Sequence, residues 1–216
     1  MKRTLIITVL IFTFIIGCAT HDAYNTGEFR QREYNVGSIT LEQGGLTQDQ
    51  IQTIISTKPP QEFPVDIAII VLADAYIPEN TELLFVSEVI EQLKLSDKIN
   101  RIVPIPKFLI PQNLTFATIQ ELGIRTLSEY VIIFVLDSDT FFKWTRILES
   151  QYEISSVIDF LIVDSQTTAI LASDKMFSQV LYMENLFEVG EREKAEQEIF
   201  SEQGILFGQN IAELFE

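Results

Sequence analysis

The sequence contains few of the residues on which many active sites depend. Cys18 is the only cysteine and His21 the only histidine among 216 residues. One cysteine cannot form a disulfide within the chain, and zinc sites or nucleophilic pairs built from His and Cys need more of these residues. The patterns GxSxG, HExxH and the phosphate-binding loop are missing as well. We therefore expect neither a Ser-His or Cys-His hydrolase nor a His/Cys zinc enzyme.

Basic residues are also scarce. Lys and Arg number 15 against 31 Asp and Glu, which gives a formal net charge of -16 at pH 7. Such a surface repels phosphate backbones and anionic head groups. Nucleic acid is therefore not an expected partner.

Long hydrophobic runs are limited to one segment near the start. Residues 5–16 are apolar except for two threonines, and they follow Lys2 and Arg3. A helix needs about 20 apolar residues to cross a bilayer core, so this run is too short for a permanent span. A short positive start followed by such a run is typical of a signal peptide.

The junction after this run, Ile15-Ile16-Gly17-Cys18, resembles the lipobox of bacterial lipoproteins. The resemblance implies cleavage after Gly17, diacylglycerol on the Cys18 sulfur, and a further acyl chain such as palmitate on the new amino group. Several acyl chains, at about 0.8 kcal/mol per buried methylene, would hold the protein at a membrane. Ala19 is similar to the outer-membrane sorting pattern, with the inner membrane as the alternative. The competing interpretation of Cys18 is an ordinary buried or free thiol.

Three regions are expected along the chain: a lipoprotein signal peptide at 1–17, a lipidated tether at 18–62 and an α/β periplasmic domain at 63–216. The tether is polar and dotted with glycine, so it can behave as a flexible coil. Within it, Thr47 can cap a short helix that carries three isoleucines on one side. We interpret this helix as packed on the domain, with a partner-binding segment as the alternative.

The domain begins as alternating strands and helices. An almost continuous apolar run at 65–76 predicts a strand buried on both faces of a sheet. INRIVPIP at 99–106 predicts a second strand, and EYVIIFVLDSD at 129–139 a third, buried strand. Helical spacing between them predicts helices at about 80–96 and 113–128. This order implies parallel neighbouring strands. Pro104 and Pro106 in the second strand place its far end at an edge of the sheet or out of it.

The order then changes toward the C-terminus. Two extended runs within 152–177, joined at about Asp164 to Thr168, predict an antiparallel hairpin. In the final helix, Gly204, Gly208 and Ala212 recur every four residues, and this costly use of glycine predicts a close approach to another element. The expected fold class is α/β: one domain of three-layer type with a mixed sheet, made of three β-α units, an antiparallel hairpin and a C-terminal helix.

This order of elements resembles a group of envelope lipoproteins similar to the TolB N-terminal domain, the curli secretion protein CsgG and the penicillin-binding-protein activators. VDSQTTAILAS at 163–173 matches the hairpin of the group, with Thr168-Ala169 where a turn glycine is usual. IVPIPKFLIPQNLTFATIQEL, the aspartate-ended strand and the helix start EREKAEQEIF are similar to the rhombotarget lipoproteins. The resemblance covers roughly 64–216. It implies a scaffold or binding role at the envelope and supplies no catalytic residue.

Asp137 and Asp139 form the most suggestive polar pair. They follow the third apolar run at a spacing that can present two carboxylates to a divalent cation. Calcium would require further oxygen ligands, six or more in all. The interpretation we favour is that both residues are solvated at the end of a strand, where they start a turn. A metal-dependent enzyme using this pair is the alternative.

Phe141, Phe142 and Trp144 cluster directly after the same predicted strand. Aromatic residues at a strand exit offer a large contact area at low entropy cost, which suits partner recognition. They could equally cover the core of the domain. The sequence leaves these two interpretations open.

The expectation that combines these observations is a lipid-anchored envelope protein that binds or assembles other envelope proteins, or its own kind, without catalysis. Apart from the covalent lipid on Cys18, no cofactor is expected. The alternatives are a metal-dependent enzyme built on Asp137 and Asp139, and a subunit of a secretion or envelope-assembly complex.

Overall fold

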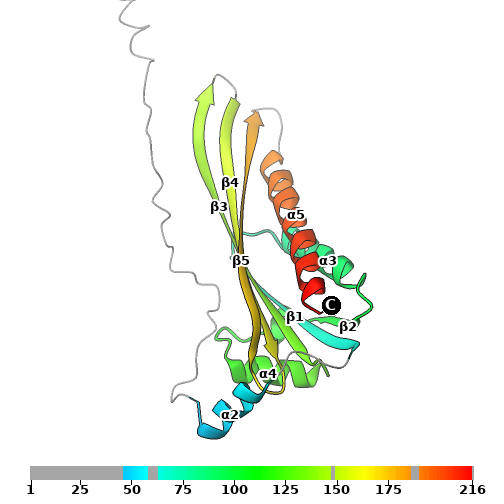
Figure 1. Cartoon of the computed structure of the whole chain (residues 1–216). Helices are drawn as coiled ribbons and strands as arrows, with labels where there is room; N and C mark the ends of the chain where they lie inside the picture. Colours follow the sequence, from blue (N-terminus) through cyan, green and yellow to red (C-terminus); the bar gives the residue numbers. More distant parts are fainter. Residues whose placement is uncertain (1–45, 58–62, 147–148, 186–189, 216) are drawn as a thin grey trace, which may run out of the picture. The chain divides into compact units, whose positions relative to one another are not determined.

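The computed structural model describes residues 46–57, 63–146, 149–185 and 190–215 (Figure 1). The elements follow in the order α2 (Gln48–Ser56), β1 (Val65–Ala73), α3 (Glu79–Leu93), β2 (Ile99–Pro104), the 3-10 helix η1 (Lys107–Leu109), α4 (Phe116–Arg125), β3 (Tyr130–Arg146), β4 (Glu149–Asp164), β5 (Ile170–Asn185) and α5 (Glu191–Leu214). The five strands form one mixed sheet in the order β2-β1-β3-β4-β5. This confirms the α/β fold class expected from the sequence.

Both predicted kinds of strand pairing are present. β1 pairs in parallel with β2 and with β3, whereas β3–β4 and β4–β5 are antiparallel. Helices α3 and α4 return the chain between the parallel strands, as such connections require. β2 lies at one edge of the sheet and ends at Pro104, where a proline is tolerated because no further strand needs its N–H.

Helices cover both faces of the sheet beside β1. On one face, α3 and α5 enclose a core in which Phe85, Phe134, Phe160 and Phe207 meet at ring-centroid distances of 5.1 to 6.5 Å. On the other face, α4 covers a smaller apolar cluster that includes Val131. Burying one such side chain stabilises the fold by about 1.5–3 kcal/mol. This two-sided burial explains why β1 is almost wholly apolar.

The glycines of α5 allow it to lie against α3. A Cβ atom added to Gly204 would come within 2.8 Å of the Phe85 carbonyl oxygen, and one added to Gly208 within 2.5 Å of the Gln92 Cβ. Real side chains do not approach so closely, so any larger residue would push the helices apart. The predicted close approach is therefore confirmed, and the partner is α3.

The hairpin between β4 and β5 is organised by Asp164. Its Oδ1 accepts hydrogen bonds from the Gln166 and Thr167 backbone N–H groups at 2.9 and 2.7 Å. Thr168 has a φ of +60°, a left-handed conformation that is uncommon for a β-branched residue. This is the position where the resembling group has glycine, and the Asp164 hydrogen bonds help to hold threonine there.

Helix α2 has the predicted cap. The Gln50 N–H donates to Thr47 Oγ1 at 3.3 Å, and the Thr47 N–H donates to Gln50 Oε1 at 2.8 Å, which together form a capping box. No residue of α2 is buried, and Ile55 is exposed. Ile51 and Ile54, on the same side of the helix, are half-buried. The packing of this helix on the domain stays a prediction.

Candidate binding surface on the outer ribbon

Strands β3, β4 and β5 continue well beyond the end of β1. β1 pairs with β3 only as far as Leu136, whereas β3 and β4 remain paired to Arg146. We call this extension the outer ribbon, which comprises residues 137–146, 149–157 and 177–185. Figure 1 shows it rising past β1 and β2, with the N-terminal part of α5 beside it.

One face of the outer ribbon packs against α5. Ile154 and Tyr182 are buried there together with Ala195 of α5. The Tyr152 ring stacks on the Tyr182 ring with centroids 5.3 Å apart, and the Phe142 ring meets Tyr152 edge-on at 5.6 Å. Burial raises the pKa of the Tyr182 phenol, the Glu184 carboxylate adds to this shift, and the positive charge of Arg192 opposes it.

Polar side chains also join α5 to this face. The Ser156 Oγ donates to Gln203 Oε1 at 2.7 Å, and the Ser138 Oγ donates to Glu196 Oε1 at 3.4 Å. All four residues are buried. Hydrogen bonds inside a protein must be made to specific partners because leaving a buried polar group unpaired is costly. These two bonds therefore fix the position of α5 along the ribbon.

The opposite side of the outer ribbon, which we call the open face, follows from the strand register. Directly opposed residues share a face, so four rows cross the three strands: Asp137–Val157–Phe177, Asp139–Ser155–Gln179, Phe141–Glu153–Leu181 and Trp144–Gln151–Met183. The apolar cluster beneath α4 lies on this side of the sheet but contains no residue of the outer ribbon. Leu181 is 56% exposed and Met183 37%.

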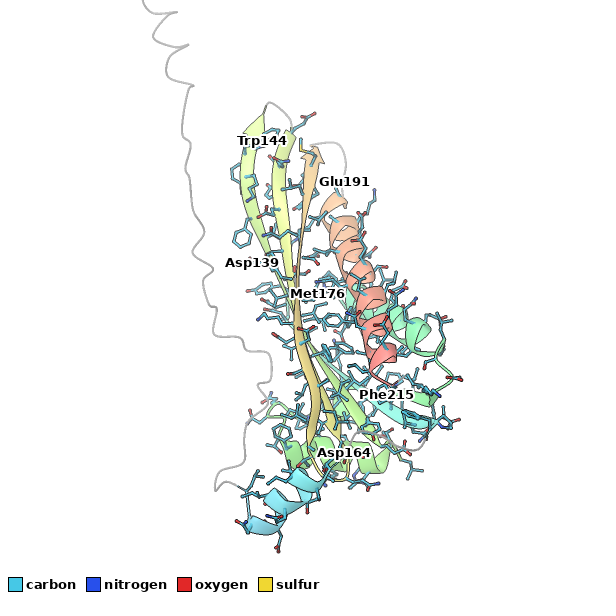
Figure 2. The ribbon with its side chains drawn as sticks, viewed as in Figure 1. Asp139, Trp144, Asp164, Met176, Glu191 and Phe215 are labelled. Atoms are coloured by element: carbon cyan, nitrogen blue, oxygen red, sulfur yellow. The ribbon has the colours of Figure 1, made fainter. Side chains whose placement is uncertain are left out.

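Asp137 and Asp139 do not lie at a strand end. β3 passes through both, and they stand opposite Val157 and Ser155 of β4. The favoured interpretation of a strand-end turn is therefore wrong, because pairing with β4 keeps this segment extended. Both carboxylates belong to the open face, and Figure 2 shows Asp139 partway along the ribbon. In the described part of the chain, no group of three or more His, Cys, Asp or Glu is placed to hold a metal ion.

Phe141, Phe142 and Trp144 do not form one patch. The register of β3 against β4 shifts between Phe142 and Trp144, which leaves Lys143 as an extra residue. Phe141 and Trp144 consequently lie on the open face, and Phe142 lies on the face toward α5. Their predicted position beyond the strand is wrong, since all three belong to β3. Figure 2 shows Trp144 near the outer end of this strand.

The bulge also places a cation on the open face. The Lys143 Nζ lies 2.9 Å from Glu153 Oε1, and farther down the sheet the Lys175 Nζ lies 3.4 Å from Asp159 Oδ1. Ion pairs this exposed contribute about 0–1 kcal/mol each. The open face therefore combines partly exposed apolar side chains with the Lys143–Glu153 ion pair and the carboxylates of Asp137 and Asp139.

Leu181 and Met183 were not among the binding residues expected from the sequence. The second run of the hairpin was expected within residues up to 177, but β5 continues to Asn185. The continuing run MFSQVLYM carries a weak strand signal, and its lack of polar alternation hides which residues face outward.

The predicted lipidation site belongs to a different part of the chain. Gly17 and Cys18, with the signal peptide and most of the tether, are outside the described residues. Within the described ranges, none of the helices has the length and apolar character needed to cross a bilayer.

Comparison with known proteins gives matches in structure only. No protein-family model matches the chain, and no curated protein matches it in sequence. Similar solved structures include a neuraminyllactose-binding hemagglutinin homologue from Helicobacter pylori, at TM-score 0.47 and 10% identity over 72% of this chain and 90% of that one. A minor lipoprotein from Acinetobacter baumannii gives 0.40 and 6% over 69% and 94%. The PelC dodecamer from Paraburkholderia phytofirmans gives 0.38 and 9% over 71% and 93%. Similarity at this level assigns neither a family nor an activity.

Proposed function

We propose that this chain is a lipid-anchored module of the bacterial cell envelope that binds or assembles proteins through its outer ribbon. The observation that carries the proposal is the open face. A sheet face in a small domain is normally covered by another layer because its apolar side chains must be buried. Among the described residues, the apolar cluster under α4 stops at the inner sheet, which is the part of the five strands outside the outer ribbon. Beyond it, Ser155 and Val157 of the central strand are buried, but Leu181 and Met183 of β5 remain substantially exposed.

The character of this face suits protein recognition. Large apolar side chains with a polar surround provide most of the energy in protein interfaces. Phe141 and Trp144 contribute aromatic surface to the same face. Glu153, which pairs with Lys143, stands between Phe141 and Leu181 in one row. We assign no catalytic role to the residues of this face.

The sequence at the start of the chain supports the proposed location in the cell envelope. Acylation of Cys18 after cleavage at Gly17 would place the domain on the periplasmic side of a membrane, the outer membrane being favoured. The segment 18–62 would then act as the tether. Envelope proteins, or further copies of this chain, are the partners that such a location makes available.

Metabolic labelling with a palmitate analogue tests the proposed lipid anchor and membrane location. The wild-type chain should carry the label, sediment with outer-membrane fractions and lack residues 1–17. Cys18→Ser should lose the label and be released from the membrane. A wild-type chain that is unlabelled, or that retains its first residues, contradicts the proposal.

Photo-crosslinking in cells tests the binding surface. A photoreactive amino acid at position 181 should give one adduct of defined mass. The matched control is position 83 on α3, where leucine is 61% exposed but far in sequence from the outer ribbon. Equal labelling at both positions, or no adduct at 181, contradicts a binding role for the open face.

A further inference from the structure

The two edges of the sheet are built differently. β2 has 6 residues and ends at Pro104, and its Arg101 is held by Asp66 at 2.8 Å. β5 has 16 residues, contains no proline, and among the described strands pairs only with β4. Natural sheets usually protect an edge with a short strand, proline or charged residues, because an unpaired edge invites another strand. β2 has such protection, and most of β5 does not.

The middle of β5 is uncharged. From Met176 to Met183 there is no Asp, Glu, Lys or Arg, although the chain carries a formal net charge of -16. Two copies of so acidic a chain repel each other over most of their surfaces. An uncharged edge is the place where they can approach without opposing carboxylates. A basic partner, by contrast, would be drawn to the acidic surface elsewhere.

We propose that β5 pairs antiparallel with β5 of a second copy of this chain, around a two-fold axis near Val180. The pairing would join two five-stranded sheets into one, with both copies of α5 on the same side. A two-fold contact uses the same surface on both subunits, so the edge must be complementary to itself. This inference deepens the assembly role proposed above and rests on it.

The side chains favour an axis at Val180 over one at Gln179. Residues directly opposite across an antiparallel pair lie on one face and interact. With the axis at Val180, Met183 lies opposite the partner's position 177, which is also apolar, and this contact occurs twice. An axis at Gln179 would instead place Asp174 opposite the partner's position 184, a glutamate, and like charges directly opposed are destabilising.

A cysteine scan along β5 tests the pairing in the full-length chain, in an oxidising envelope. Val180→Cys should give a disulfide-linked dimer, since residues paired at a two-fold axis have Cα atoms about 4.5–5.5 Å apart. Asp174→Cys should give none, because its two copies would be 12 residues out of register and about 40 Å apart at 3.3 Å per residue. The chain with only Cys18, and the Leu83→Cys variant, serve as controls.

A second measurement does not depend on disulfide geometry. The full-length chain in detergent should sediment as a dimer, and Leu181→Lys should shift it to a monomer while Leu83→Lys leaves the dimer intact. Circular dichroism of each variant confirms that it is folded. A monomeric wild-type chain, or equal crosslinking along the whole of β5 and at position 83, overturns the inference.

The outcomes also separate this inference from the broader proposal. If photo-crosslinking at position 181 captures a different protein and no dimer forms, self-pairing is wrong and the binding role stands. If position 181 gives no adduct and the chain is monomeric, both are wrong.

Discussion

The outer ribbon extends three of the five strands of the inner sheet, and the two regions are stabilised differently. β3 begins as YVIIFVL, beside β1, with helices on both faces, and continues as DSDTFFKWTR, with α5 on one face only. The inner sheet buries its aromatic core completely. The outer ribbon depends on a small apolar cluster and on two buried hydrogen bonds from Ser138 and Ser156. Most of the stabilising burial therefore lies in the inner sheet. The outer ribbon can consequently leave apolar residues exposed.

Of the substitutions predicted here, removing the Phe207 ring should lower the stability of the protein the most. Phe207 is buried in the inner core, and its ring lies 5.3 Å from Phe160 and 5.7 Å from Phe134. Phe207→Ala should lower the free energy of unfolding by about 3–5 kcal/mol, because it leaves a cavity that these neighbours cannot fill. Urea denaturation followed by circular dichroism measures the change.

The matched control is Phe142→Ala in the outer ribbon. The Phe142 side chain is 58% exposed, although its ring contacts Tyr152. Its removal should cost about 1 kcal/mol or less, since edge-to-face contacts contribute about 0.5–1.5 kcal/mol. Equal losses for the two variants would contradict the difference between the regions.

Adding a methyl group at Gly208 of α5 should cause the next largest loss of stability. Gly208→Ala should destabilise the protein by about 1–3 kcal/mol, because the new Cβ would meet Gln92 Cβ at 2.5 Å and the Val89 carbonyl oxygen at 2.9 Å. Helix propensity alone predicts the opposite sign, a gain of about 1 kcal/mol. Asn210→Ala, at an exposed position of the same helix, should not destabilise. A Gly208→Ala variant at least as stable as wild type would show that α3 and α5 are not so closely packed.

The inner sheet was the more predictable region. Continuous β-branched runs mark β1 and the start of β3 because burial on both faces leaves no place for polar residues. The hairpin turn near Asp164 and the glycine spacing of α5 were also visible, since each depends on local chemistry. The strands and the turn could be predicted because local sequence determines them. The glycine spacing predicted that α5 approaches another element closely, but not that this element is α3.

The outer ribbon was less predictable because its structure depends on distant residues. Asp137-Ser138-Asp139 has the composition of a turn, and only pairing with residues 155–157 of β4 makes it a strand. The extra residue Lys143 then decides that Trp144 shares a face with Phe141 rather than with Phe142. A one-residue shift of this kind leaves no trace in hydrophobic periodicity. The sequence therefore named four of the residues on the open face, Asp137, Asp139, Phe141 and Trp144, but not their common surface.

Two buried tyrosines, one in each region, give the smallest predicted effect. Burial raises the pKa of Tyr130 in the inner sheet, with added repulsion from Asp164 and Glu129, and burial likewise raises the pKa of Tyr182 in the outer ribbon. A pKa above the unfolded value of about 10 means that the folded state holds the phenol proton more tightly. The resulting stability is fully present below about pH 10 and is lost as pH rises through the folded pKa. Urea midpoints measured from pH 8 to 11 should therefore fall less steeply in Tyr130→Phe and in Tyr182→Phe than in wild type. An unchanged slope in the Tyr182→Phe variant alone would show that the outer ribbon opens before its tyrosine ionises, and the two regions would then unfold separately.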